Sequence, residues 1–231
     1  MASYQNQDKN ATMSLIEKIA TIFSSRSRKN KYSQFITECR PTPEDSILDI
    51  GVNTREYSPF DNYLEKQYPH KKNITAIGLE EGSSFKSLYP EITYLQADGR
   101  ELPFKNNQFD LVYSNAVLEH VGTREQQCDF LRELLRVGKR GYITTPNRFF
   151  PVEVHTRVPL LHILLPKSLF DAFLSLIGKD WATGNYMNLL SEKELRLLLD
   201  AAGISDYSLL RNRFLGLTMT FTVIWKKHPL I

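Results

Sequence analysis

The chain has little cysteine and no long apolar run, and each shortage excludes a class of protein. Its two cysteines, Cys39 and Cys128, are far apart and lack CxxC spacing, so we expect no disulfide framework and no zinc or other metal site. No stretch approaches the roughly 20 apolar residues of a membrane-spanning helix. Residues 1–8 are polar and lack the apolar segment of a secretory signal, so a cytoplasmic location is expected.

An excess of charge of one sign is also missing. The 231 residues carry 29 lysines and arginines against 26 acidic residues, a net charge of +3. That balance is too mild to indicate nucleic-acid binding, for which a basic stripe is expected. One basic run, residues 26–31, is interpreted as a solvated helix face or a linker. We therefore predict no nucleic-acid partner.

What the chain does contain is an alternation of strand-like and helix-like segments. Short apolar runs predict strands at residues 46–50, 73–79, 91–97, 109–114 and 140–145. Helices are expected between them, at 57–68 and 126–137 among others. Two further runs, 204–210 and 216–226, predict an antiparallel hairpin at the end of the chain. The predicted class is α/β, with a Rossmann-like, seven-stranded, mostly parallel sheet and helices on both faces.

The domain organisation follows from where this alternation begins and breaks. Residues 1–40 are predicted to be an N-terminal helical extension that packs on the core, with short helices over 13–23 and 31–39. Residues 41–231 are predicted to be a single domain with a helical cap inserted at about 148–188. A later helix, 191–202, begins with a capping box made by Ser191 and Glu194.

Carboxylates follow three successive strands of the predicted sheet. Asp49 lies at the end of the first, Glu80 follows the second and Asp98 follows the third. A single such acid is most often a helix N-cap, but three at one sheet edge indicate a ligand, because ligands of parallel sheets bind outside the carboxyl ends of the strands. A carboxylate after the second strand can accept hydrogen bonds from a ribose diol.

Small and polar residues complete this edge. Gly51 and Gly99 allow a ligand to approach the backbone closely. Asn53 stands where a second glycine would be expected, and asparagine tolerates positive φ well. Ser114 and Asn115 follow the fourth strand.

In these residues the chain resembles the class I S-adenosylmethionine-dependent methyltransferases, in particular their type 11-like branch. The resemblance is carried by the segments ILDIG (47–51), IGLE (77–80), ADGRELPF (97–104), QFDLVYS (108–114) and VLEHV (117–121). It implies that Asp49, Gly51 and Asn53 contact the methionine part of S-adenosylmethionine. It further implies that Glu80 binds the ribose, that Asp98 and Gly99 bind the adenine, and that Ser114 and Asn115 face the sulfonium. The loop departs from the family in having one glycine where two or three are usual.

Two histidines are candidate catalytic residues. Methyl transfer is an in-line displacement at an activated carbon, so it depends mainly on alignment, and a general base helps only when the acceptor holds its proton. His120 follows the fourth strand and His155 follows the fifth, with Glu153 as a more distant candidate. The alternatives are that His120 braces its loop and that His155 lies in a simple connection.

Three functions are compatible with these residues. The favoured one is S-adenosylmethionine-dependent methyl transfer to a small-molecule or lipid-linked acceptor, with the apolar segment 158–177 as a cap that makes peripheral membrane contact. The alternative is a non-catalytic binding or scaffold protein with the methyltransferase fold, which the single glycine of the loop would favour. A methyltransferase acting on protein or RNA would be expected to show a basic surface or an added domain.

Overall fold

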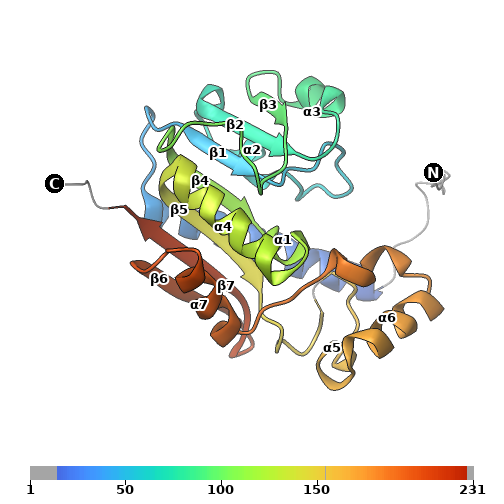
Figure 1. Ribbon diagram of the computed structural model, residues 1–231. Helices are drawn as coiled ribbons and strands as arrows, with labels where there is room; N and C mark the ends of the chain where they lie inside the picture. The colour runs from blue at the N-terminus through green and yellow to red at the C-terminus, as the bar shows by residue number, and fades with distance from the viewer. Residues whose placement is uncertain (1–14, 154, 228–231) are drawn as a thin grey trace.

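The computed structural model describes residues 15–153 and 155–227, and side chains from residue 25 onward. Seven strands form one sheet in the order β3-β2-β1-β4-β5-β7-β6 (Figure 1). The strands are β1 (Ile47–Ile50), β2 (Ile74–Gly78), β3 (Thr93–Gln96), β4 (Phe109–Asn115), β5 (Gly138–Pro146), β6 (Tyr207–Phe214) and β7 (Leu217–Lys226). The first five are parallel, and β7 is antiparallel to both β5 and β6. This confirms the predicted fold class and the closing hairpin.

The α-helices are α1 (Leu15–Cys39), α2 (Tyr63–Gln67), α3 (Ser83–Leu88), α4 (Arg124–Val137), α5 (Leu161–Leu164), α6 (Lys167–Leu176) and α7 (Glu192–Ala201). Single 3₁₀ turns are η1 (Lys71–Asn73), η2 (Leu118–His120), η3 (Asp180–Ala182) and η4 (Gly184–Tyr186). None of the helices within the described ranges is long and apolar enough to cross a membrane.

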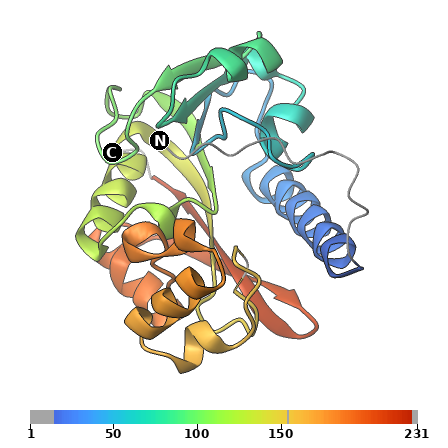
Figure 2. The ribbon, with the colours of Figure 1, turned by 90° about the vertical axis from the view of Figure 1, so that its right-hand side faces the viewer.

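Alternating side chains along the strands build a core on each face of the sheet. Leu48 of β1 and Ile143 of β5 point to the face covered by α4 and α7. Their neighbours Ile47 and Tyr142 point to the opposite face, where Phe35 of α1 packs together with apolar residues of α2 and α3. Figure 2 shows α1 on one side of the sheet and α4 and α7 on the other. The short apolar runs that predicted the strands supply the sheet side of both cores.

The N-terminal part of the chain differs from the prediction of two short helices. The described part of this segment is a single helix, α1, which runs through the basic run 26–31 without a break. It contains neither proline nor glycine, so its polar middle section has nothing that interrupts helical hydrogen bonding. Residues 1–14 of the predicted extension lie outside the described residues, and the division into 1–40 and 41–231 stays a prediction.

The predicted helix over 57–68 is wrong in its first half. Residues 57–62 form turns, and only α2 is helical. The carboxylate of Asp61 accepts hydrogen bonds from the backbone N–H groups of Tyr57 and Ser58, at 2.9 and 3.0 Å. An aspartate that binds backbone donors in this way competes with helix formation. The loop after β1 is therefore long.

The other helices agree with the sequence more closely. The capping box of α7 is present, with the Ser191 hydroxyl accepting from the Glu194 N–H and the Glu194 carboxylate accepting from the Ser191 N–H. The segment between β5 and α7 contains α5 and α6, which lie beyond the end of β5 (Figure 1). A small apolar cluster of its own includes Phe170, Leu174 and Met187. This segment lies within the helical insertion predicted at about 148–188, and its role as a cap stays a prediction.

The contact between Gly141 and Trp225 gives a test of the β5–β7 pairing. These residues are register partners, and a Cβ at position 141 would lie 2.0 Å from the buried indole of Trp225. We expect Gly141→Ala to lower the free energy of unfolding by about 1–3 kcal/mol, because the ring must shift within a packed core. Urea unfolding measures this, with Thr93→Ala on the exposed face of β3 as the control. Equal stability of the two variants would contradict the packing described.

Candidate functional site

The candidate cofactor site lies where the strand order reverses, between β1 and β4. Gly51 leaves β1 with a φ of 95°, a conformation that favours glycine. Its N–H donates to the carbonyl of Ile77 at 2.9 Å, which holds the loop against the end of β2. A Cβ on Gly51 would lie 2.3 Å from the side chain of Val117. The glycine therefore lets the VLEHV segment approach the end of β1.

Asn53 does not adopt the left-handed conformation that would have made it a substitute for glycine. Asn62 does, with a φ of 48°, and it is the residue that shapes the loop. The Asn62 side chain accepts from the N–H of Asn53 and donates to the Asn53 carbonyl, both at 2.9 Å. This paired amide contact spans the turns of residues 57–62. The prediction that Asn53 replaces a glycine through positive φ is therefore wrong.

Glu80 lies at the carboxyl end of β2, as predicted. Its side chain accepts a hydrogen bond of 2.7 Å from the hydroxyl of the buried Thr54. Thr54 comes from the loop after β1, so this bond joins the two strand ends that would flank a ribose. The other carboxylate oxygen of Glu80 is thereby oriented by the loop.

Asp49 is buried beside a second carboxylate, Glu65 of α2. Burial and the proximity of Glu65 raise the pKa of Asp49 well above its usual value, and burial also raises the pKa of Glu65. Two buried carboxylates side by side cannot both ionise easily, which favours a proton on the pair. No sequence pattern pointed to Glu65, because the contact depends on how α2 packs against the sheet.

Asp98 and Gly99 follow β3 as expected. Hydrogen bonds to the Arg100 guanidinium outweigh partial burial and lower the pKa of Asp98, and the two charges are 2.6 Å apart. Asp98 is therefore ionised and already oriented. A Cβ on Gly99 would lie 2.6 Å from the ring of Phe130, so this glycine permits close packing of the β3 end on α4.

Ser114 and Asn115 end β4, but only Asn115 faces the site. The Ser114 hydroxyl is buried and donates to the carbonyl of Ile50 at 3.1 Å, which ties β4 to β1. The Asn115 side-chain oxygen accepts from the Thr144 hydroxyl at 2.6 Å and from the Lys31 ammonium at 3.3 Å. Lys31 is buried, and this burial lowers its pKa to about 8. The interpretation of residues 26–31 as a solvated face is therefore wrong for Lys31, which is buried.

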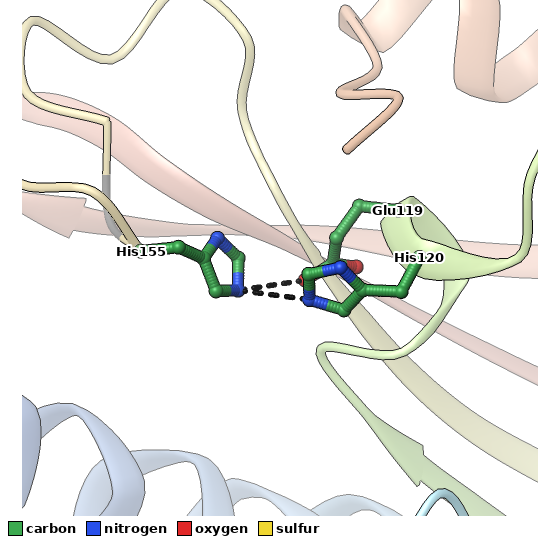
Figure 3. Close-up of side chains that lie close together, drawn as sticks. All are labelled: Glu119, His120 and His155. Atoms are coloured by element: carbon green, nitrogen blue, oxygen red, sulfur yellow. Dashed lines mark hydrogen bonds and ion pairs between the residues drawn. The ribbon is translucent and has the colours of Figure 1, made fainter. Parts of the chain in front are cut away.

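The two candidate catalytic histidines meet beside this edge. Nε2 of His120 and Nε2 of His155 are 3.2 Å apart, although the residues are 35 positions apart in the chain. Figure 3 shows the two rings and the Glu119 carboxylate pointing toward one another, from η2 and from the loop after β5. The Glu119 Oε1 atom is 3.5 Å from His155 Nε2 and 3.9 Å from His120 Nε2. The structure thus brings together residues that the sequence placed separately.

The far nitrogen of each ring is held by an acceptor. His120 Nδ1 donates to the Tyr186 carbonyl at 2.9 Å, and His155 Nδ1 lies 3.0 Å from Glu153 Oε1. Burial lowers the pKa of His120. The pKa of His155 is raised, because Glu153 and Glu119 together outweigh its burial. Glu153 therefore orients the ring of His155. This role fits its position better than the role of a general base.

Glu119 is the residue of this cluster that the sequence analysis left without a role. It is fully buried, and its Oε2 atom accepts from the Thr145 hydroxyl at 3.1 Å. Its other oxygen, Oε1, has no hydrogen-bond donor among the described residues. The signal was present in the VLEHV segment, but only the folded chain shows that Glu119 points inward under both imidazoles.

Comparisons with known proteins agree with the fold. Residues 48–144 match the sequence model of a family described as "Methyltransferase domain". A tRNA (carboxymethyluridine(34)-5-O)-methyltransferase of Saccharomyces cerevisiae is 38% identical over 56 residues, which are 24% of this chain and 20% of the yeast protein. The chain therefore matches about a fifth of the length of this curated relative.

Solved structures share the fold at low sequence identity. A SAM-dependent methyltransferase from Methanosarcina mazei superposes with a TM-score of 0.55 at 18% identity, covering 82% of this chain and 94% of that one. The magnesium protoporphyrin IX methyltransferase of Synechocystis PCC 6803, solved with bound SAH, gives a TM-score of 0.54 at 14% identity, covering 93% and 89%. Over residues 48–144 the chain thus matches a methyltransferase domain, and its strand order is that of the predicted Rossmann-like methyltransferase fold.

Proposed function

We propose that this protein transfers a methyl group from S-adenosylmethionine to a small-molecule or lipid-linked acceptor. The observation that carries the proposal is the convergence, at one sheet edge, of Gly51, Glu80 and Asp98 with the imidazoles of His120 and His155. Ligands of open parallel sheets bind at this edge. The first three residues belong to the cofactor side and the two histidines to the acceptor side.

On the cofactor side, each predicted residue has a distinct task. Glu80, oriented by Thr54, accepts hydrogen bonds from the ribose hydroxyls. Asp98 and the backbone of Gly99 receive the adenine, while the loop at Gly51 and Asn53 receives the methionine part. Asp49 lies below this loop with Glu65. A pair of carboxylates there favours a cofactor that carries positive charge on its amino group and its sulfur.

On the acceptor side, the protein has to align an acceptor atom with the methyl group and exclude water. Such alignment contributes up to about 7–11 kcal/mol to lowering a barrier. Asn115 and the cluster of Glu119, His120 and His155 lie at the ends of β4 and β5. Two imidazoles over a buried carboxylate favour removal of a proton from an acceptor that holds one.

The surface of the cap favours an apolar or lipid-linked acceptor. Leu164, Leu169 and Leu176 are 69%, 56% and 84% exposed, on α5 and α6. Leu169 and Leu176 are seven positions apart and so share one face of α6. Large apolar side chains gathered on one surface are typical of a lipid or protein contact. We propose that this face makes the peripheral membrane contact.

Transfer to RNA is a second candidate, because the yeast relative that matches 56 residues is a tRNA methyltransferase. The surface of this chain argues against it. Lys31 is buried, and Arg28 is engaged by Asp61 at 3.3 Å, so the basic run offers little to a phosphate backbone. A scaffold without catalysis remains the other alternative, and cofactor binding distinguishes it.

Cofactor binding is tested by calorimetry with S-adenosylmethionine and S-adenosylhomocysteine. We expect Glu80→Ala to weaken both by roughly 10- to 100-fold, because hydrogen bonds to a charged group contribute about 1.5–3 kcal/mol. Glu81→Ala removes the neighbouring acid, which binds Ser83 instead, and should leave affinity unchanged. Unchanged affinity in Glu80→Ala would refute the ribose assignment, and absence of binding to the unaltered chain would favour a scaffold.

The Asp49–Glu65 pair makes stability depend on pH. Folding raises the pKa values of both carboxyl groups. The pair therefore stabilises the folded state at acidic pH, and this stabilisation is lost as the pH rises through the folded-state pKa values. We measure the free energy of unfolding of Glu65→Gln and of the unaltered chain without ligand, and take the difference, variant minus unaltered. We expect this difference to increase by about 1 kcal/mol from pH 5 to pH 8, because the variant lacks the pair. The exposed Glu38→Gln is the control. Parallel pH profiles for Glu65→Gln and the unaltered chain would be inconsistent with a shared proton.

Membrane contact is tested by co-sedimentation with mixed phosphatidylcholine and phosphatidylglycerol vesicles. Changing Leu164, Leu169 and Leu176 together to serine should lower the bound fraction at least about tenfold, because burying one leucine side chain contributes about 1.5–3 kcal/mol. The matched control changes three exposed leucines elsewhere, Leu88, Leu197 and Leu215. Equal sedimentation of the two triple variants would rule out the cap as the contact.

A further inference from the structure

We infer that Glu119, His120 and His155 form a binding site for one divalent transition-metal ion, with an open position that faces the methyl acceptor. The cluster contains two imidazole nitrogens and one carboxylate oxygen that lie close enough to share an ion. Two histidines and one glutamate are a known ligand set of catalytic zinc sites, which keep one position open for water or substrate. The role given to the ion depends on the proposed methyl transfer; the site itself does not.

The distances between the three atoms fit coordination of one ion. Metal–ligand bonds of about 2.0–2.2 Å at tetrahedral angles place neighbouring ligand atoms about 3.3–3.6 Å apart. The observed separations are 3.2 Å between the two Nε2 atoms, and 3.5 and 3.9 Å from Glu119 Oε1 to His155 and His120. Each separation therefore lies inside this range or within a few tenths of an ångström of it.

Nδ1 of each ring is bound to an acceptor, so Nε2 of each ring is available to coordinate an ion. The carbonyl of Tyr186 can only accept, so Nδ1 of His120 carries the hydrogen and Nε2 carries a lone pair when the ring is neutral. Nδ1 of His155 faces Glu153 in the same manner. Histidines that bind metals almost always donate their other N–H to a carboxylate or a backbone carbonyl, and this cluster contains one of each.

The buried oxygen of Glu119 is the independent observation that points to a cation. Glu119 is fully buried, and Oε1, the oxygen nearest both imidazoles, finds no donor within the described ranges. A proton on one imidazole could bridge two of the three lone-pair atoms, whereas a metal ion contacts all three. Among the charges that act on His155, the carboxylates of Glu119 and Glu153 oppose the ammonium of Lys31.

The open side of the cluster is the side on which the two imidazoles lie. The two imidazoles are each about one fifth exposed while Glu119 lies beneath them, so a fourth ligand can enter only from their side. That ligand would be an acceptor presenting an oxygen, such as a hydroxyl or a carboxylate. A hydroxyl bound there would lose its proton to solvent. Its oxygen would then form the new bond to the methyl carbon, as the carbon–sulfur bond breaks and its electron pair stays on sulfur.

The test is direct metal binding by the full chain, which is treated with a chelator and then titrated with Zn²⁺ in a calorimeter. We expect one ion per chain, and Co²⁺ should give the visible absorption of a site with nitrogen and oxygen ligands. His155→Ala and Glu119→Gln should each weaken Zn²⁺ binding at least about 100-fold, and Glu119→Gln keeps the side-chain shape if alanine perturbs folding. His162→Ala, a histidine on α5 outside the cluster, is the matched control and should change affinity less than about twofold.

The outcomes separate the ion site from the proposed reaction. If Zn²⁺ binds the unaltered chain no better than it binds the His155→Ala and Glu119→Gln variants, the ion site is refuted. Calorimetry with S-adenosylhomocysteine on the same preparations reports the cofactor site independently. A chain that binds Zn²⁺ but not S-adenosylhomocysteine supports the ion site and overturns the proposed function. A chain that binds S-adenosylhomocysteine but not Zn²⁺ supports the proposed function and overturns the ion site.

Discussion

The parallel pairing of β1 with β4 at the centre of the sheet is the constraint on which the rest of the site depends. It creates the point where the strand order reverses, and the Ser114 hydroxyl holds the two strand ends together through the Ile50 carbonyl. Gly51 can turn away from β1 only because it lacks a side chain where Val117 packs. The candidate cofactor loop and the segment that carries Glu119 and His120 therefore come from adjacent strand ends.

The site combines acidic groups in different electrostatic states. Pairing with Arg100 lowers the pKa of Asp98, whereas burial raises the pKa values of Asp49 and Glu65 in the core. Glu119 is buried next to two imidazoles, with one oxygen bound by Thr145. These environments differ because each carboxylate meets a different partner, although all of them lie near the same sheet edge. Partners, more than residue types, decide what each acid does.

Much of the fold could be predicted because it depends on local patterns. Apolar runs such as 109–114 and the Ser191–Glu194 capping box involve neighbouring residues, so the sequence indicates them directly. The two errors in the helices have different causes. Asp61 binds the backbone of Tyr57 and Ser58 and thereby shortens the predicted helix to α2. Without a proline or glycine, the polar middle of α1 stays helical.

By itself, the sequence determined the order of strands and helices, the parallel class of the sheet and the acids that follow its strands, because all of these depend on residues close together in the chain. Which of those residues meet depends on the tertiary structure. It brought His120 to His155, buried Glu119 beneath them and set Glu65 against Asp49. Contacts between segments far apart in the chain depend on how the helices pack and the loops cross, and no local pattern encodes them.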